Sequence, residues 1–226
     1  MKRVSLLVVA SALFIPAGRS ASASEFNWEN MIHAWMKLNI DFNYSKAQVD
    51  SYMQLFRPDV WKNVRNNEFE REKARTETTA LMKMRVQDFN LKEDIVLNTT
   101  LPIGQFNFDT ETFPIEKMRD TTYWYPQARY SENLPSNLHI FISNTKSFDA
   151  LKMSKEAAAA LVKERNEKFR GDRNLAVTIK FRVTKLRSRD TEILAEIQSL
   201  TLFRDPKRNE VLAVLKNNPE KEESKK

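Results

Sequence analysis

The fold is decided by one stretch, residues 175–203, which has the sequence LAVTIKFRVTKLRSRDTEILAEIQSLTLF. Every second side chain is apolar in its first half, from Leu175 to Val183, and the alternation resumes from Ile193 to Phe203. A period of two is typical of strands that bury one face. With a loop at 188–190, the stretch predicts a hairpin that pairs Phe181 with Ile197 and Val183 with Ala195, because a one-residue slip would turn every apolar side chain outward.

The same register has consequences for the other face of the hairpin. It places Arg182 opposite Glu196 and Lys180 opposite Gln198. Cross-strand pairs of this kind contribute about 0.2 to 1 kcal/mol each. The cationic run KFRVTKLRSR is therefore explained as part of a sheet, without invoking an anionic partner.

Upstream of the hairpin, residues 27–90 have the pattern of helices. Apolar residues recur at helical spacing after Asn27, and Ser45 with Gln48 has the spacing of a capping box. Pro58 ends one helix and suits the first turn of the next, and Asn67 marks a further helix start. These signals are read from the sequence.

Residues 94–216 have a sheet-rich pattern. Short β-branched and aromatic runs bounded by Gly, Pro, Asn and Asp predict strands in DIVLNTTL, GQFNFD, FPIEKM, LHIFIS and EVLAVL. A helix over 155–170 interrupts them, with Ser154 as its cap and Gly171 as its left-handed terminal residue. We therefore expect an α+β fold, with N-terminal helices followed by a mostly antiparallel sheet and one inserted helix, forming a single domain over 24–216.

The first 23 residues have the pattern of a cleaved signal peptide, with two cations, an apolar run and the small triplet Ala21-Ser22-Ala23. No later stretch is apolar for the roughly 20 residues that a membrane span needs, so we expect no transmembrane segment after cleavage. The chain has no cysteine and so lacks the lipid-attachment residue of a bacterial lipoprotein. We expect a periplasmic or secreted bacterial protein, with a disordered tail at 217–226.

Charge and composition disfavour several functions. The formal net charge of +7 falls to +4 once Lys2, Arg3 and Arg19 leave with the signal peptide, which disfavours nucleic acid as a partner. Two glycines remain in the mature chain, too few for a dinucleotide fingerprint or a phosphate loop. Thiol catalysis is excluded without cysteine. We therefore expect no cofactor.

The two histidines offer little for catalysis. His33 lies on a polar stripe with Glu29 and Lys37, which favours a solvated side chain over a ligand or base. His139 shares a strand face with Phe141, which favours a packed or surface role. The spacing of the pair matches no zinc motif, so we expect no metal site and name no catalytic residue.

The segment RDTTYWYPQARY, residues 119–130, is the one candidate site. Its residues Tyr123, Trp124, Tyr125, Arg129 and Tyr130 fall in the longest stretch without periodicity. Exposed rings and an arginine can anchor a protein partner or stack on an envelope glycan. The alternative is that the rings fix a long loop to the core, in which case Trp124 lies on the side opposite Tyr123 and Tyr125.

Two stretches, RPDVWKNVRNNEFERE at 57–72 and IGQFNFDTETFPI at 103–115, resemble a family of bacterial exported proteins described as a domain of unknown function. The resemblance implies an exported α+β domain and no activity or site residue. We expect a non-enzymatic envelope protein that binds a protein partner through a sheet face, a sheet edge or the aromatic loop. The alternative is a carbohydrate or peptidoglycan binding protein or hydrolase that uses the same loop.

Overall fold

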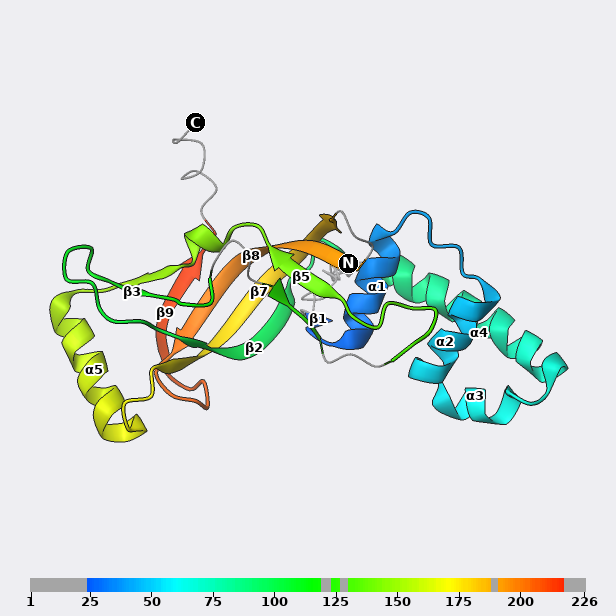
Figure 1. The fold of residues 1–226 in the computed structure, drawn as a ribbon, viewed down its shortest axis with the longest axis horizontal. Helices are drawn as coiled ribbons and strands as arrows, with labels where there is room; N and C mark the ends of the chain where they lie inside the picture. Colours follow the sequence, from blue (N-terminus) through cyan, green and yellow to red (C-terminus); the bar gives the residue numbers. More distant parts are fainter. Residues whose placement is uncertain (1–23, 119–122, 127–129, 188–190, 218–226) are drawn as a thin grey trace, which may run out of the picture.

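The computed structural model describes residues 24–118, 123–126, 130–187 and 191–217. Helices gather at one end of an elongated molecule, a twisted sheet occupies the middle, and one helix stands at the other end (Figure 1). The helices are α1 Trp28–Leu38, α2 Lys46–Phe56, α3 Pro58–Val64, α4 Glu68–Asp88 and α5 Lys155–Phe169, with a 3₁₀ turn η1 at Thr145–Ser147. The predicted α+β fold, with helices before the sheet and one helix inserted, is confirmed.

The main sheet has the order β1-β2-β7-β8-β5-β4, and β9 also pairs with β8. Its strands are β1 Ser24–Glu25, β2 Ile95–Pro102, β4 Tyr123–Trp124, β5 His139–Ile142, β7 Asn174–Leu186, β8 Glu192–Phe203 and β9 Val211–Lys216. The β1–β2 and β5–β8 pairs are parallel and the others antiparallel. A second, two-stranded sheet joins β3 Thr112–Pro114 to β6 Ala150–Lys152.

The predicted helix starts agree with the observed caps. The side chains of Asn27, Ser45, Asn67 and Ser154 each accept a backbone amide of the first helical turn. Ser45 and Gln48 form the predicted capping box. Each such cap contributes about 1 kcal/mol by satisfying amides that have no partner within the helix. At the other end of α5, Gly171 has the predicted left-handed backbone, with φ +78°.

The hairpin of β7 and β8 has the predicted pairs Phe181–Ile197, Val183–Ala195 and Arg182–Glu196. Lys180 lies opposite Ser199, so the predicted pair with Gln198 is wrong. A bulge leaves one extra residue in β8 at this point, and from there Leu200 and Leu202 are the buried residues. The alternation predicted to continue to Phe203 is therefore shifted by one residue.

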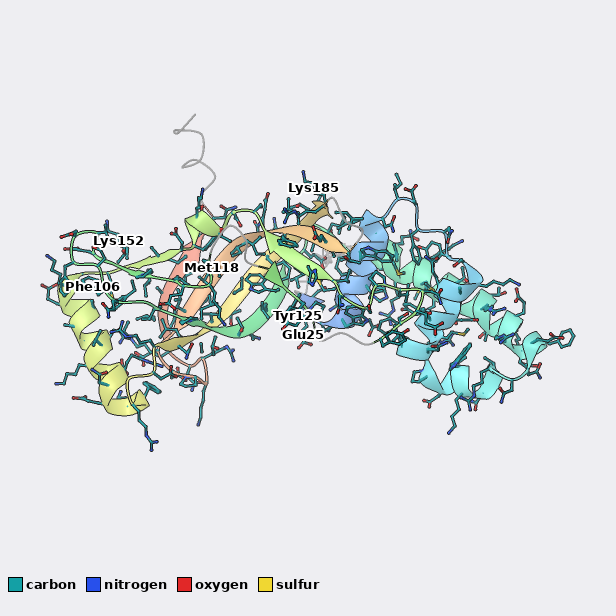
Figure 2. The ribbon with its side chains drawn as sticks, in the orientation of Figure 1. Glu25, Phe106, Met118, Tyr125, Lys152 and Lys185 are labelled. Atoms are coloured by element: carbon teal, nitrogen blue, oxygen red, sulfur yellow. The ribbon has the colours of Figure 1, made fainter. Side chains whose placement is uncertain are left out.

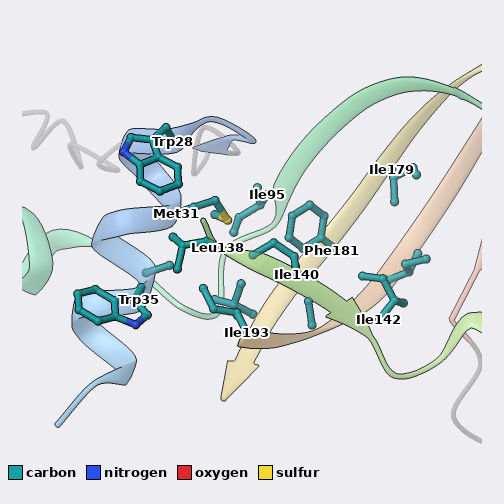
Figure 3. Close-up of a cluster of buried hydrophobic side chains, with 14 of the residues drawn as sticks. Trp28, Met31, Trp35, Ile95, Leu138, Ile140, Ile142, Ile179, Phe181 and Ile193 are labelled. Atoms are coloured by element: carbon teal, nitrogen blue, oxygen red, sulfur yellow. The ribbon is translucent and has the colours of Figure 1, made fainter. Parts of the chain in front are cut away.

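The core continues from the sheet to α1. Met31 of α1 points toward Ile95 and the strands that carry Phe181 and Ile193 (Figure 3). Trp28 and Trp35 of the same helix belong to the same buried cluster as these residues and Ile140. These side chains are at most 5% exposed. Complete burial of one such side chain contributes about 1.5 to 3 kcal/mol. The contact of α1 with the sheet therefore holds the helical end of the molecule against the strands.

Residues 104–109, predicted as a strand, form an irregular segment and a turn. The Asn107 side chain accepts the amides of Asp109 and Thr110, and Glu111 has a left-handed backbone with φ +53°. An Asx turn of this kind reverses the chain and competes with strand pairing. The prediction of a strand in GQFNFD is therefore wrong.

Within the described residues, no helix has the length and apolarity required to cross a membrane.

Candidate functional site

A cavity lies along one face of α5. It has a volume of about 550 Å³ and is lined by Phe106, Phe108, Lys155, Ala158, Ala159, Val162, Lys163, Asn166 and Glu167. We call it the α5 groove. The helical residues among these recur every three or four positions, so they share one side of the helix. At about 1.5 Å per residue, the groove extends for about 18 Å along α5.

The facing wall is the segment that carries Phe106 and Phe108. The two rings meet edge to face, with centroids 5.2 Å apart, and Phe106 lies 5.0 Å from the ring of Phe113. Phe113 is fully buried, whereas Phe108 is 68% exposed. Figure 2 shows Phe106 on the segment that runs beside α5. The aromatic side chains of this wall therefore run from the buried Phe113 to the solvent-exposed Phe108.

A close backbone approach fixes this wall. The Gly104 amide donates to the Pro114 carbonyl at 2.8 Å, and a Cβ at Gly104 would lie 2.6 Å from Pro114 Cγ. Arg173 Nη1 donates to the Gly104 carbonyl at 2.6 Å. Only glycine fits this approach, which anchors the start of the segment that bears the two phenylalanines.

The groove has an apolar floor and a charged rim. Ala158, Ala159 and Val162 form the floor, and their small size leaves the space open. Lys155 lies at one end, and Lys163 pairs with Glu167 at 3.9 Å with both side chains exposed. Among the described lining residues, Glu167 is the only carboxylate, and there is no hydroxyl, imidazole or thiol. The arrangement is suited to holding an apolar group.

A second cleft, of about 400 Å³, lies between α2 and α4. We call it the α2–α4 cleft. Its wall contains an ion network in which Arg75 contacts Asp50 at 2.6 Å and Glu72 at 3.0 Å, and Lys46 contacts Glu72 at 3.0 Å. The hydrogen bonds from Lys46 and Arg75 lower the pKa of Glu72, and the hydrogen bond to Asp50 raises the pKa of Arg75. The network ties the two helices together.

His33 is buried and not solvated, so that prediction is wrong. Its Nε2 shares a hydrogen bond of 2.9 Å with the hydroxyl of Tyr52 on α2, and its exposed fraction is 4%. Burial, together with the positive charge of Arg85, lowers the pKa of His33 to about 4. Burial also raises the pKa of Tyr52 to about 12. Of the polar stripe, His33 alone is buried, against Tyr52 and Phe56 of α2, whereas Glu29 is exposed and Lys37 is half-buried.

The structure places the predicted aromatic residues differently from one another. Trp124 is half-buried on β4 and its ring centroid lies 5.6 Å from that of Phe181. Tyr125 is 68% exposed and Tyr130 is 79% exposed. Arg129 and the side chain of Tyr123 lie outside the described residues. The aromatic segment therefore contributes one ring to the core and two to the surface.

The second histidine lies within the main sheet. His139 is half-buried on β5 beside Phe141, with ring centroids 6.4 Å apart, as its strand position predicted. Within the described part of the chain, no three histidine, aspartate or glutamate residues are grouped so as to hold a metal ion.

Sequence reasoning missed the α5 groove. Its signals are the run Ala157–Ala160 in a helix and the pair Phe106 and Phe108 in a segment that we had predicted as a strand. In a strand, two phenylalanines at that spacing would share one face. In the observed turn they form a wall, because the chain reverses directly after them.

Comparison with known families identifies one to which the chain is similar. Residues 44–164 match the model of the family described as Domain of unknown function (DUF4852), over more than half of the chain. The chain belongs to this family. The match includes both stretches on which the resemblance rested, the whole α2–α4 cleft, and the α5 groove as far as Lys163. No curated protein and no solved structure matched the chain.

Proposed function

We propose that this chain is an exported, non-enzymatic envelope protein whose α5 groove binds an amphipathic segment of a partner protein. The observation that carries the proposal is an apolar groove with an exposed phenylalanine at its mouth. Exposed apolar surface in a hollow is typical of binding sites, because its desolvation supplies the affinity.

The dimensions of the groove suit a peptide segment. A volume of about 550 Å³ lies within the range of ligand sites. The groove follows α5 for about three turns, long enough to receive side chains that recur along one face of a partner helix. Phe108 and Val162 would contact those side chains, and the small side chain of Ala159 leaves room for them in the groove.

The charges at the rim indicate the polar residues of the partner. Lys155 lies in the first turn of α5, where the helix dipole adds to its positive charge. Lys163 adds a second cation, partly balanced by Glu167. An acidic residue beside the apolar positions of the segment would complement the Lys155 end. We therefore expect the segment to be amphipathic and acidic.

The lining favours binding over catalysis. Hydrolysis of a glycan requires two carboxyl groups within about 5 to 10 Å, and acyl transfer requires an activated nucleophile. The described lining supplies Glu167 alone. We therefore propose an adaptor or capture role for the protein.

Peptide selection on the purified full chain tests the groove. A displayed peptide library should yield segments with large apolar residues at helical spacing and a nearby acid. Ala159→Arg fills the groove and should weaken the selected peptides at least tenfold, since it removes apolar contact and adds a cation on the floor. Ala160→Arg is the matched control, because Ala160 is exposed on the same helix and does not line the groove.

The outcomes separate the alternatives. Equal binding to both variants would place the peptide elsewhere and overturn the proposal. Selection of no peptide, with Ala159-dependent binding of a fatty acid instead, would make the groove a lipid site and would equally overturn it. Both variants should keep the circular dichroism of the parent, since both positions are helical and suited to arginine.

Export is supported by the cations, apolar run and small triplet of residues 1–23. Intact-mass measurement of the protein recovered from its native cells tests it. A mature chain that begins at Ser24, found in the periplasm or medium, is the expected result. A chain that retains Met1 and stays in the cytoplasm would contradict it.

A second candidate function, binding of an envelope glycan, is supported by the exposed rings of Tyr125 and Tyr130, since exposed aromatic rings stack on sugar rings. A thermal-shift screen against muropeptides, run beside Trp124→Ala, tests it. Because Trp124 packs on Phe181, we expect the variant to melt lower without any ligand. A concentration-dependent rise in the parent's melting point would support the glycan function, and an unchanged melting point would contradict it.

A further inference from the structure

The α2–α4 cleft has an excess of positive charge. Its lining includes the cations Lys46, Arg75 and Lys83 and one carboxylate, Glu72. Asp50 engages Arg75 from beside the lining through two hydrogen bonds, of 2.6 and 2.8 Å. Arg75 is therefore neutralised by Asp50, whereas Lys46 has only a share of Glu72.

Lys83 is the cation with the least compensation. Among the described residues, no carboxylate lies within ion-pair distance of its Nζ, which instead lies 5.5 Å from the centre of the Tyr44 ring. A cation over a ring keeps its full charge and its three donors. Lys83 thus presents a positive charge at the wall of a cleft.

Tyr44 is held in an unusual conformation at the same wall. Its φ of +52° lies in the left-handed region, which a tyrosine seldom adopts. The ring is fixed edge to face against Phe42, with centroids 4.7 Å apart, and the next residue, Ser45, begins α2 with its capping box. Backbone strain of this kind concentrates at ligand sites, because the surrounding contacts must be strong enough to maintain it.

The rest of the lining is suited to an organic body. Val49, Ala80 and the Tyr44 ring supply apolar surface. Thr79 lies beside them and adds a hydroxyl, while the Thr76 hydroxyl donates to the Glu72 carbonyl at 3.2 Å. A bare inorganic anion would leave much of a 400 Å³ space without contacts.

We propose that the α2–α4 cleft binds a small organic anion, a carboxylate or phosphate ester, with its charged group at Lys46 and Lys83 and its apolar body against Val49, Ala80 and the Tyr44 ring. Lys46 lies in the first turn of α2, so the dipole of that helix favours the same negative charge. The site is separate from the α5 groove and shares no lining residue with it.

Ligand-observed NMR and calorimetry on the full chain test the proposal with four probes: phenyl phosphate, benzoate, inorganic phosphate and benzyl alcohol. The two aryl anions should bind, and their affinity should fall as salt is raised. Inorganic phosphate lacks the apolar body and benzyl alcohol lacks the charge, so both should bind at least tenfold more weakly. The two aryl anions, compared with each other, show which headgroup the site prefers.

Variants locate the binding. Lys83→Gln should weaken phenyl phosphate about tenfold or more, since it removes a charged donor. Lys73→Gln is the matched control, because Lys73 is an exposed lysine of α4 outside the cleft lining. Tyr44→Asn removes the ring while tolerating the left-handed backbone. It should reduce phenyl phosphate toward the affinity of inorganic phosphate.

Three results would overturn the proposal: no binding of either aryl anion at about 10 mM, equal binding by Lys83→Gln and Lys73→Gln, or inorganic phosphate binding as tightly as phenyl phosphate. Ala159→Arg should leave aryl-anion affinity unchanged, so failure of this inference and failure of the groove proposal can be told apart.

Discussion

The buried His33 makes acid stability the clearest quantitative test of the helical part of the fold. His33 bonds to the Tyr52 hydroxyl and is covered by α2, and its pKa is lowered from 6.5 to about 4. The positive charge of Arg85 disfavours protonation of His33 further. At Tyr52, the charge of Glu29 raises the pKa and that of Arg57 lowers it. Protonation of His33 in the folded protein therefore requires desolvation of a cation beside another cation.

The sign and size of this pH dependence of stability follow from the difference in proton binding between the unfolded and folded states. Between pH 6.5 and about 4, the unfolded state binds a proton at His33 that the folded state does not, so stability falls as pH falls through this window. On lowering the pH from about 7.5 to about 5, this one group lowers the free energy of unfolding by about 2 kcal/mol. The full effect, reached below pH 4, is about 3 kcal/mol.

Urea unfolding followed by circular dichroism at both pH values measures this loss. His33→Gln keeps a hydrogen-bonding group near Tyr52 but does not titrate, so its stability should fall by about 2 kcal/mol less than the parent's over the same pH interval. His139→Gln, at the half-buried second histidine, is the control for replacing a histidine. An identical pH dependence in the parent and His33→Gln would refute the reasoning.

Three further predictions concern stability, each checked by urea or thermal unfolding. Asn144→Ala should lower the free energy of unfolding by about 2 kcal/mol or more, because the Asn144 side-chain amide bonds both the backbone amide and the carbonyl of Ile197. Ile197 lies between the part of β8 that pairs with β5 and the part that pairs with β9. A loss no larger than that of the exposed control Asn98→Ala would contradict this prediction. Gly104→Ala should cost about 1 to 3 kcal/mol, because the new Cβ would lie 2.6 Å from Pro114 Cγ, and an unchanged melting point would show that the approach can relax. Arg165→Met should lower the free energy of unfolding by about 3 kcal/mol or more, because the buried Arg165 donates to the carbonyls of Asp172, Asn174 and Arg204. An unchanged stability would mean that water replaces those donors.

Local signals predicted much of this fold. Caps at Asn27, Ser45, Asn67 and Ser154 are set by side chains within three residues of the amides they satisfy, so the sequence carries them directly. The hairpin register at Phe181 and Ile197 follows from the period of the apolar residues.

Features that depend on distant contacts were not predictable in this way. The bulge in β8 shifts the inward face to Leu200, and the Asn144 side chain, more than fifty residues away in sequence, bonds to the strand beside it. His33 lies on a polar stripe, and it is buried by tertiary contacts, with Tyr52 and Phe56 of α2 against its ring. A pattern within one element carries no information on what covers its polar side.

The candidate sites also depend on contacts between residues that are distant in sequence. The aromatic segment 119–130 was conspicuous by composition, yet Trp124 packs on Phe181. The α5 groove arises from small residues on one helix and two phenylalanines about fifty residues earlier. The α2–α4 cleft joins Tyr44 to Lys83 across two helices. Each cavity is formed between elements, so its residues become adjacent only in the folded chain.

Site-specific photo-crosslinking in the cells that produce the protein tests the central claim most directly. A photoreactive amino acid at Asn166, which lines the α5 groove, is compared with the same amino acid at Ala160, which does not. We predict a crosslink from position 166 alone, joined on sequencing to an amphipathic, acidic segment of one partner. Equal crosslinking from both positions, or attachment at 166 to a lipid or a polar segment, would contradict the claim that the α5 groove binds a protein segment.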